Sequence, residues 1–427
     1  MMNSKIGTLL LVFLWSWHQD AQLQDARYYR EQAGAAYNQK NYVQALENLQ
    51  KALELIPDHP SIIYGIARMQ SLLGNQQDAL IWLGKITRMG MILHPEKDPD
   101  FQGLVTLEGF RGVLKQFEAN AGPIVHSSIA FTIAEKGLVT EGIAYDRVEQ
   151  TFYISSIHKR KIVIRDKQGR MGVLADEKDG LWSVLGMAVD SGRRILWATT
   201  TAFPQMSGYD AQMEGKSAVL KFDLKAKKLI KKYPVPGPGN HGLGDLTLNS
   251  SGDVLTTDSN TPAVYVIRHD RDDIELLLKD EQFVSPQGLA FSSDQKHLFM
   301  ADYSKGLFDI DVTTNRARHI TPAPDSTSLG IDGLYFCKGN LIGVQNGVTP
   351  NRLVRLELSP DYSRMSRFEV LEVNNPLFDE PTLGVVVDDE LFFIANSQWG
   401  SVDEKGQLSP EEKLKSPLIL HLKIGPK

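Results

Sequence analysis

Acidic and amide side chains recur at two positions of a pattern that repeats through residues 138–400. One set stands at the start of an expected strand, directly beside a glycine: Glu141, Asp245, Gln287 and Asp332. The other set ends the strand that follows: Asp258, Asp302, Asn346 and Asn396. Neither position holds a Lys or an Arg. If the fold gathers them, the carboxylates must protonate or bind a cation, and oxygen ligands suit Ca²⁺, Mg²⁺ or Mn²⁺.

Short strands are the elements that must bring these residues together. Six similar runs begin at residues 141, 185, 244, 287, 332 and 383, each followed by a tight turn and a second strand-like run. Successive starts are 44, 59, 43, 45 and 51 residues apart, a spacing typical of four-stranded propeller blades. The pattern predicts an all-β six-bladed β-propeller over residues 123–427. Residues 127–133 form a further strand-like run that we expect to complete the sixth blade.

In a blade, the start of the innermost strand lies beside the end of its antiparallel neighbour, at one mouth of the central channel. Both sets of polar residues should therefore converge there. A structural interpretation competes for Asp258 and Asp302, because aspartates at strand ends often accept N–H bonds from the following turn. Glu141 and Asp332 have no turn to cap, which favours a functional role. His158 is expected near the same mouth, as a proton shuttle or merely solvated; the same holds for His241.

Residues 26–90 have a different character, rich in Ala, Gln and Leu at helical spacing. Small and packing residues repeat after thirty-four positions: Ala33, Ala45, Leu49 and Ala52 return as Ala67, Ala79, Leu83 and Ile86. This period predicts an N-terminal all-α tetratricopeptide-repeat domain over residues 22–122, with two repeats and capping helices in residues 91–120. Such a domain is either a peptide-binding surface or a helical appendage for packing or dimerisation.

The first residues of the sequence bear on whether the protein is exported. Lys5 precedes a ten-residue apolar run, residues 6–15, which is about half the length that a helix needs to cross a bilayer. The run predicts a signal peptide over residues 1–21, cleaved near Ala21, and a periplasmic or secreted protein without a membrane span after cleavage. The alternative is an apolar N-terminal helix of the next domain.

Composition excludes several classes of function. The net charge is −6, from 46 Lys+Arg against 52 Asp+Glu, so we expect no nucleic acid as partner. With Cys337 as the single cysteine, neither an internal disulfide nor a cysteine zinc site can form. The sequence also lacks the GxxxxGK[ST], HExxH and GxSxG patterns of phosphate loops, zinc proteases and serine hydrolases.

Three glycine motifs carry a resemblance to a known family. Glu141-Gly142 opens the first blade, Gln287-Gly-Leu-Ala-Phe-Ser-Ser-Asp the fourth and Asp332-Gly-Leu the fifth. Together with the blade pattern over roughly residues 138–425, these motifs resemble the six-bladed superfamily of gluconolactonase, regucalcin (senescence marker protein) and luciferin-regenerating enzyme. The family has Asn where this chain has Gln287, and a family Asn-Asp pair appears here as Gly244-Asp245. A looser likeness to NHL-type propellers, which mostly bind partners, is also present.

The resemblance implies a divalent cation held by Glu141, Gln287 and Asp332, with Asp332 also the general base of lactone hydrolysis. Two hypotheses remain open. The protein is either a metal-dependent lactone or ester hydrolase, or a non-catalytic exported scaffold that binds a small molecule or a protein partner. Fold alone does not choose between them, because propellers carry many unrelated functions.

Overall fold

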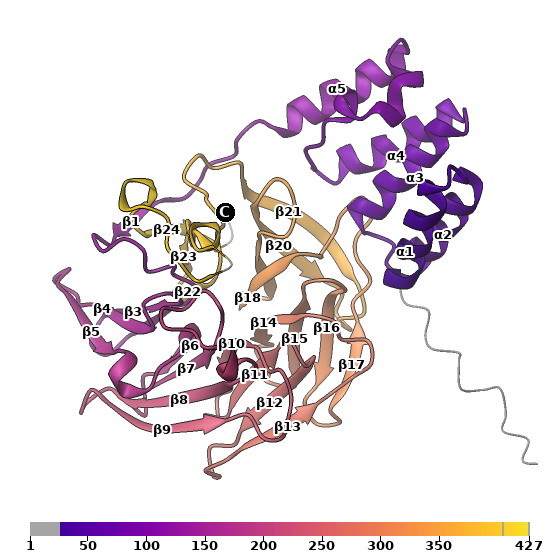
Figure 1. Ribbon diagram of the computed structural model, residues 1–427. Coiled ribbons are helices and arrows are strands. Elements are labelled where there is room, and N and C mark those ends of the chain that lie inside the picture. The colour runs from indigo at the N-terminus through magenta and orange to yellow at the C-terminus, as the bar shows by residue number, and fades with distance from the viewer. Residues whose placement is uncertain (1–25, 404, 426–427) are drawn as a thin grey trace, which may run out of the picture.

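The computed structural model describes residues 26–403 and 405–425 (Figure 1). The predicted signal peptide, residues 1–21, lies outside them. A helical region occupies residues 26–120, and the strands run from Ser128 to Lys423. No helix among the described residues is long and apolar enough to cross a membrane.

The helical region consists of two antiparallel helix pairs and a fifth helix. Its helices are α1 (Ala26–Asn38), α2 (Tyr42–Leu55), α3 (Pro60–Leu72), α4 (Gln76–Arg88) and α5 (Glu108–Asn120), with 3-10 turns at Pro95–Lys97 and Pro99–Leu104 before α5. Ala45, Ala52, Ala67 and Ala79 are fully buried, because only small side chains fit where neighbouring helices touch. The predicted helical domain is confirmed, and its identity as tetratricopeptide repeats stays a prediction.

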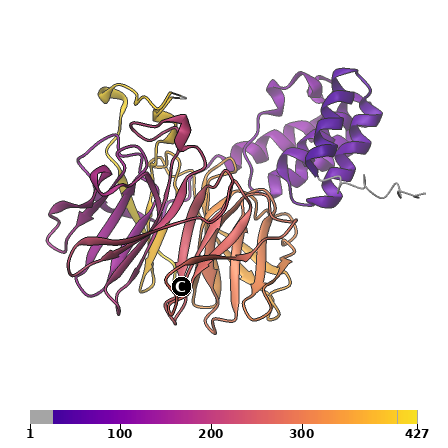
Figure 2. The same cartoon turned by 60° about the horizontal axis from the view of Figure 1, so that its bottom comes forward.

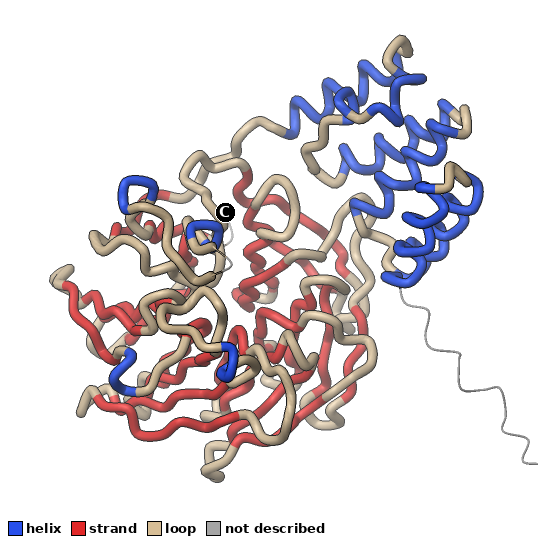
Figure 3. Tube along the Cα trace, viewed as in Figure 1, coloured by secondary structure: helices blue, strands red, loops and turns tan. Residues whose placement is uncertain are grey.

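Six four-stranded antiparallel sheets surround a central axis, which confirms the six-bladed propeller (Figure 3). Blades one to three comprise β2 (Ile143–Asp146), β3 (Thr151–Ser156), β4 (Lys161–Arg165) and β5 (Met171–Ala175); β6 (Ser183–Asp190), β7 (Ile195–Thr201), β8 (Ser217–Asp223) and β9 (Lys228–Pro234); and β10 (Leu243–Leu248), β11 (Val254–Asp258), β12 (Ala263–Ile267) and β13 (Ile274–Leu278). Blades four and five comprise β14 (Pro286–Phe291), β15 (His297–Asp302), β16 (Gly306–Asp311) and β17 (Arg316–His319); and β18 (Ile331–Cys337), β19 (Asn340–Gln345), β20 (Arg352–Leu358) and β21 (Met365–Val373).

Blade six combines strands from both ends of the propeller sequence. It contains β22 (Gly384–Val387), β23 (Glu390–Ile394), β24 (Leu418–Lys423) and β1 (Ser128–Thr132). β1 pairs antiparallel with β24, with Ser128 opposite His421 and Thr132 opposite Leu418. The expected closing strand is therefore present, and it joins the first and last parts of the ring.

The glycine that recurs in the inner strands makes room for the next blade. A Cβ atom at Gly142 would overlap the carbonyl oxygen of Leu185. A Cβ atom at Gly186 would lie 2.7 Å from the Cα atom of Asp245, and one at Gly288 would lie 2.5 Å from the carbonyl oxygen of Asp332. All three neighbours are backbone atoms of the following blade. The motif therefore reflects the close approach of inner strands around the channel.

Gly288→Ala is expected to destabilise the propeller by at least about 2 kcal/mol, because the added methyl group meets backbone that cannot turn away. The melting temperature measures the loss. Gly112→Ala is the matched control, because a Cβ atom on this α5 residue meets nothing within 4 Å. We expect the control to melt at or slightly above the wild-type temperature, since Ala favours helix over Gly. Equal melting of Gly288→Ala and the wild type would refute the close-packing explanation.

The helical region packs against blades four and five. Leu329 joins the buried cluster of Ile56, Ile62 and Ile66. The buried Arg352 guanidinium donates from Nη1 to the carbonyl oxygen of Met89, 2.8 Å away. Figure 2 shows the helices beside the ring, level with the long loops that rise from one of its faces.

Candidate active site at the channel mouth

The channel mouth brings together three of the predicted acidic residues. Glu141, Asp245 and Asp332 are only 7%, 8% and 8% exposed. The negative charge of Asp332 raises the pKa of both other carboxyl groups, in addition to the larger effect of burial. Three of the five predicted carboxylates therefore lie close enough to influence one another.

The inner strands are irregular where Asp245, Gln287 and Asp332 stand. The pairing of β10 with β11 shifts between Leu243 and Leu246, and the pairing of β18 with β19 shifts between Ile331 and Leu334. The same irregularity interrupts β14 around Gln287. A bulge changes the direction of the side chains that it contains. Asp245, Gln287 and Asp332 therefore depart from the regular alternation of side chains between the two faces of a strand.

Hydrogen bonds orient the two residues that the resemblance singles out. Glu141 Oε2 accepts from Trp399 Nε1 at 2.7 Å and from Ser397 Oγ at 3.4 Å. Asp332 Oδ2 accepts from Asn346 Nδ2 at 2.9 Å. Asn346 is itself fixed, because its Oδ1 accepts from the hydroxyl of Tyr303 at 3.0 Å. Each carboxyl group is therefore held at one oxygen by a neutral donor.

The electrostatics of the mouth disfavour negative charge. Burial raises the pKa of Asp332 to about 6 and that of Asp245 to about 7. Burial and the charge of Asp332 raise the pKa of Glu141 well above its usual value. Glu380 adds to the repulsion, and its own pKa is raised by burial. Among the described residues, no Lys or Arg contributes to any of these shifts.

Several mouth residues were missed by sequence reasoning. Glu380 and Trp399 lie in the loops before β22 and after β23, outside the repeated strands. Tyr335 lies inside β18, where its hydroxyl accepts from the Gly384 amide and burial raises its pKa strongly. Gly333 could have pointed to Tyr335. The glycine leaves room for the Tyr335 hydroxyl, which would lie 2.5 Å from a Cβ atom at position 333. An aromatic residue two positions after the inner-strand glycine could have been read as a channel residue.

Three other predicted residues are engaged in local turns and strand ends. Asp302 accepts from four backbone N–H groups, those of Val284, Ser285, Ser304 and Lys305. Asp258 accepts from the backbone of Gly242, Asn260 and Thr261 and from the ring of His241. Asn396 donates to the carbonyl of Ser416 and accepts from the amide of Leu418. These contacts agree with the structural interpretation of Asp258 and Asp302.

The two histidines are not solvated. His158 Nδ1 lies 2.7 Å from the carbonyl oxygen of Gln205, and His241 Nδ1 lies 2.6 Å from Asp258 Oδ2. Both rings are buried. The expectation that they are merely solvated is wrong, because His158 is covered by the insertion in blade two and His241 packs against Asp258 and Tyr265 of blade three.

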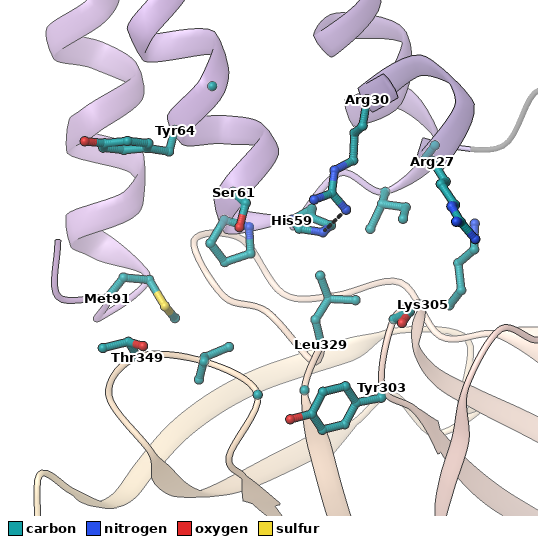
Figure 4. Close-up of a pocket in the computed structure, with 18 of the residues that line it drawn as sticks. Arg27, Arg30, His59, Ser61, Tyr64, Met91, Tyr303, Lys305, Leu329 and Thr349 are labelled. Carbon is teal, nitrogen blue, oxygen red and sulfur yellow. Dashed lines mark hydrogen bonds between the residues drawn. The ribbon is translucent and has the colours of Figure 1, made fainter. Parts of the chain in front are cut away.

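A cavity of about 1270 Å³ lies between the helical region and the channel mouth (Figure 4). Tyr303 and Asn346 line it. Asn346 also donates to Asp332, so this one side chain contacts both the cavity and that carboxylate. On another side of the mouth, Trp399 packs edge-on against Phe203 from the insertion in blade two, with ring centroids 6.1 Å apart.

The donor set fits a hard divalent cation in its chemistry. Glu141, Gln287 and Asp332 offer oxygen ligands, and a cation would offset the repulsion that raises the two carboxyl pKa values. Gln287 donates from Nε2 to Ser285 Oγ at 3.3 Å, which leaves its Oε1 for such a role. Within the described residues, no group of three or more His, Cys, Asp or Glu side chains is arranged to hold a metal ion. The predicted ligands Glu141, Gln287 and Asp332 include only two residues of these types, because Gln287 is an amide.

No protein-family model and no curated protein matches the sequence. Several solved structures are similar to part of the chain at low identity. A gluconolactonase from Xanthomonas campestris is 14% identical, with a TM-score of 0.46 over 70% of this chain and 94% of that chain. A PQQ-bound aldose sugar dehydrogenase from Streptomyces coelicolor is 14% identical, with a TM-score of 0.47 over 70% and 99%. A virginiamycin B lyase from Staphylococcus aureus is 13% identical, with a TM-score of 0.47 over 71% and 89%. The structural neighbours thus include gluconolactonase-like six-bladed propellers.

Proposed function

We propose that the channel mouth is the active site of a lactone or ester hydrolase in which Asp332 is the general base. The observation that carries this proposal is the cluster of buried carboxyl groups at the mouth, next to a cavity large enough for a small molecule. Periplasmic or extracellular location is part of the proposal and rests on residues 1–21 of the sequence alone.

One oxygen of Asp332 is available for the role of general base. Asn346 occupies Oδ2 of Asp332, so Oδ1 can take a proton from an attacking water. A pKa of about 6 leaves this carboxylate ionised at neutral pH and close to the best value for a base. Burial and the charge of Asp332 raise the pKa of Glu141 as well, so a cation beside both carboxylates would relieve their repulsion.

A divalent cation held by Glu141, Gln287 and Asp332 would polarise the carbonyl group of the substrate. Trp399 and Ser397 hold the Glu141 carboxyl group in place, and Tyr303 holds Asn346. These neutral donors orient the acidic side chains without neutralising them. The alternative function, a non-catalytic scaffold, would use the same mouth for binding only.

Asp332→Asn is expected to reduce hydrolysis at least about 100-fold, because the amide keeps the shape of the side chain and cannot accept the proton. Proton release from a panel of sugar lactones and simple esters measures the rate, with Ca²⁺, Mg²⁺, Mn²⁺ or a chelator present. Asp388→Asn is the matched control, because Asp388 is exposed on the turn between β22 and β23. Turnover that is absent with every cation, or that Asp332→Asn leaves unchanged, would favour the scaffold.

A further inference from the structure

The cavity between the helical region and the propeller has apolar side chains in part of its wall. Ile56 and Met91 contribute to it from the helical region, and Leu329 and Val348 from loops of the propeller. Its volume of about 1270 Å³ exceeds the roughly 300–1000 Å³ of ordinary small-molecule sites, so it has room for an organic ligand and water.

The charged residues of its wall are mostly cationic. They are Arg27, Arg30, Arg68 and Lys305, against the single acid Glu31. Arg27 pairs with Glu31 at 3.1 Å, and Arg68 donates from Nε to Asp100 at 2.7 Å. Among the described residues, Arg30 and Lys305 have no carboxylate within ion-pair distance. Within residues 26–403 and 405–425, two cations of the wall thus lack a carboxylate partner.

His59 holds one of these cations in place. Its Nε2 lies 3.4 Å from Arg30 Nη1, and Figure 4 shows Arg30 reaching from α1 to this ring above Leu329. Burial and the charge of Arg30 lower the pKa of His59 to about 4, so the neutral ring accepts from the guanidinium at physiological pH. Lys305 approaches the same cavity from the turn between β15 and β16.

We propose that this cavity binds a small organic anion, with its apolar body against Leu329 and Met91 and its carboxylate or phosphate group on Arg30 and Lys305. The guanidinium group of Arg30 can donate two parallel hydrogen bonds to a carboxylate or a phosphate. The ammonium group of Lys305 adds a second positive charge but does not fix the orientation of the anion. Because Tyr303 and Asn346 connect the cavity to Asp332, the anion is the recognition group of the substrate. This last step rests on the proposed hydrolase, whereas the binding of the anion does not.

The test measures binding of two fluorescent probes to the full chain: 1-anilinonaphthalene-8-sulfonate and N-phenyl-1-naphthylamine, which has the same rings without the sulfonate. Arg30→Gln combined with Lys305→Gln should weaken binding of the sulfonate at least tenfold and leave the neutral probe within twofold. Arg316→Gln combined with Lys225→Gln is the control of equal charge change, at exposed residues away from the cavity. The control should bind both probes as the wild type does.

Competition identifies the head group. Octanoate or octyl phosphate should displace the sulfonate probe from the wild type, and octanol should not. The anion that displaces the probe at the lower concentration carries the preferred head group.

Unchanged sulfonate binding after the double substitution, equal loss in the control, or equal displacement by octanol would overturn the anion site. Asp332→Asn should bind the probe normally. A chain without hydrolytic activity that still shows the Arg30 and Lys305 dependence would refute the hydrolase and retain the anion site.

Discussion

Asp245→Asn is expected to raise the melting temperature at pH 8 and to leave it nearly unchanged at pH 4. Burial raises the pKa of Asp245 to about 7 in the folded chain, against an ordinary value of 3.8. The folded state therefore binds the proton more tightly than the unfolded state. The stability that the neutral form provides is complete below pH 3.8 and is lost as the pH rises through 7.

The expected size of this effect is a few kcal/mol, because each pKa unit corresponds to about 1.4 kcal/mol. Asparagine has no charge to bury, so the gap between the variant and the wild type should open between pH 4 and pH 7 and then stay constant. Melting curves in chelator at one-unit pH steps measure it. Asp388→Asn, which removes only an exposed ion pair with Arg147, should show a small offset that does not grow between pH 5 and pH 8. A pH-independent gap for Asp245→Asn would contradict the buried-charge explanation.

Arg352→Ala is expected to destabilise the chain by about 3–5 kcal/mol and to loosen the helical region from the propeller. The Arg352 side chain is fully buried, donates to the Met89 carbonyl and to Gln345 Oε1, and stacks 4.9 Å from the ring centre of Phe368. Alanine would leave two buried acceptors without donors and a void beside an aromatic ring.

Urea unfolding measures the loss, and limited proteolysis between Asn120 and Ser128 reports whether the helices have detached. Arg352→Met should lose less stability than Arg352→Ala, because it fills most of the volume and removes a buried charge whose pKa desolvation lowers to about 9. Arg367→Ala on β21 is the control, since its side chain is 61% exposed. Equal losses for Arg352→Ala and Arg367→Ala would show that the buried contact contributes nothing.

The blades could be predicted because the features that make them recur in every copy. The inner-strand glycine repeats, since each blade must admit the backbone of the next, as at Gly142 and Gly288. The position of Glu141 and Asp332 beside that glycine then follows from the repeat. The helical spacing of small residues such as Ala45 and Ala79 predicted the helical region for the same reason.

The remaining mouth residues could not be predicted because they lie outside the repeat. Trp399 reaches Glu141 from the long loop between β23 and β24, and the two residues are separated by 258 positions. Nothing in the sequence distinguishes Arg352 from other strand residues. It is buried against the helical region, where it donates to the carbonyl of Met89, 263 positions away. Contacts of this kind are set by how the two units dock, which no local pattern records.

The strand that closes the ring has a consequence for how the chain reaches its native state. Ser128 Oγ and His421 Nε2 lie 2.7 Å apart, although 293 positions separate them. Blades one to five each use four consecutive strands and can form as the ribosome releases them, whereas β1 must wait for β24. Glu141 also meets Trp399 only when blade six shuts. The channel mouth is thus complete only after blade six has been synthesised, and a chain that stops before Trp399 cannot form the contact with Glu141.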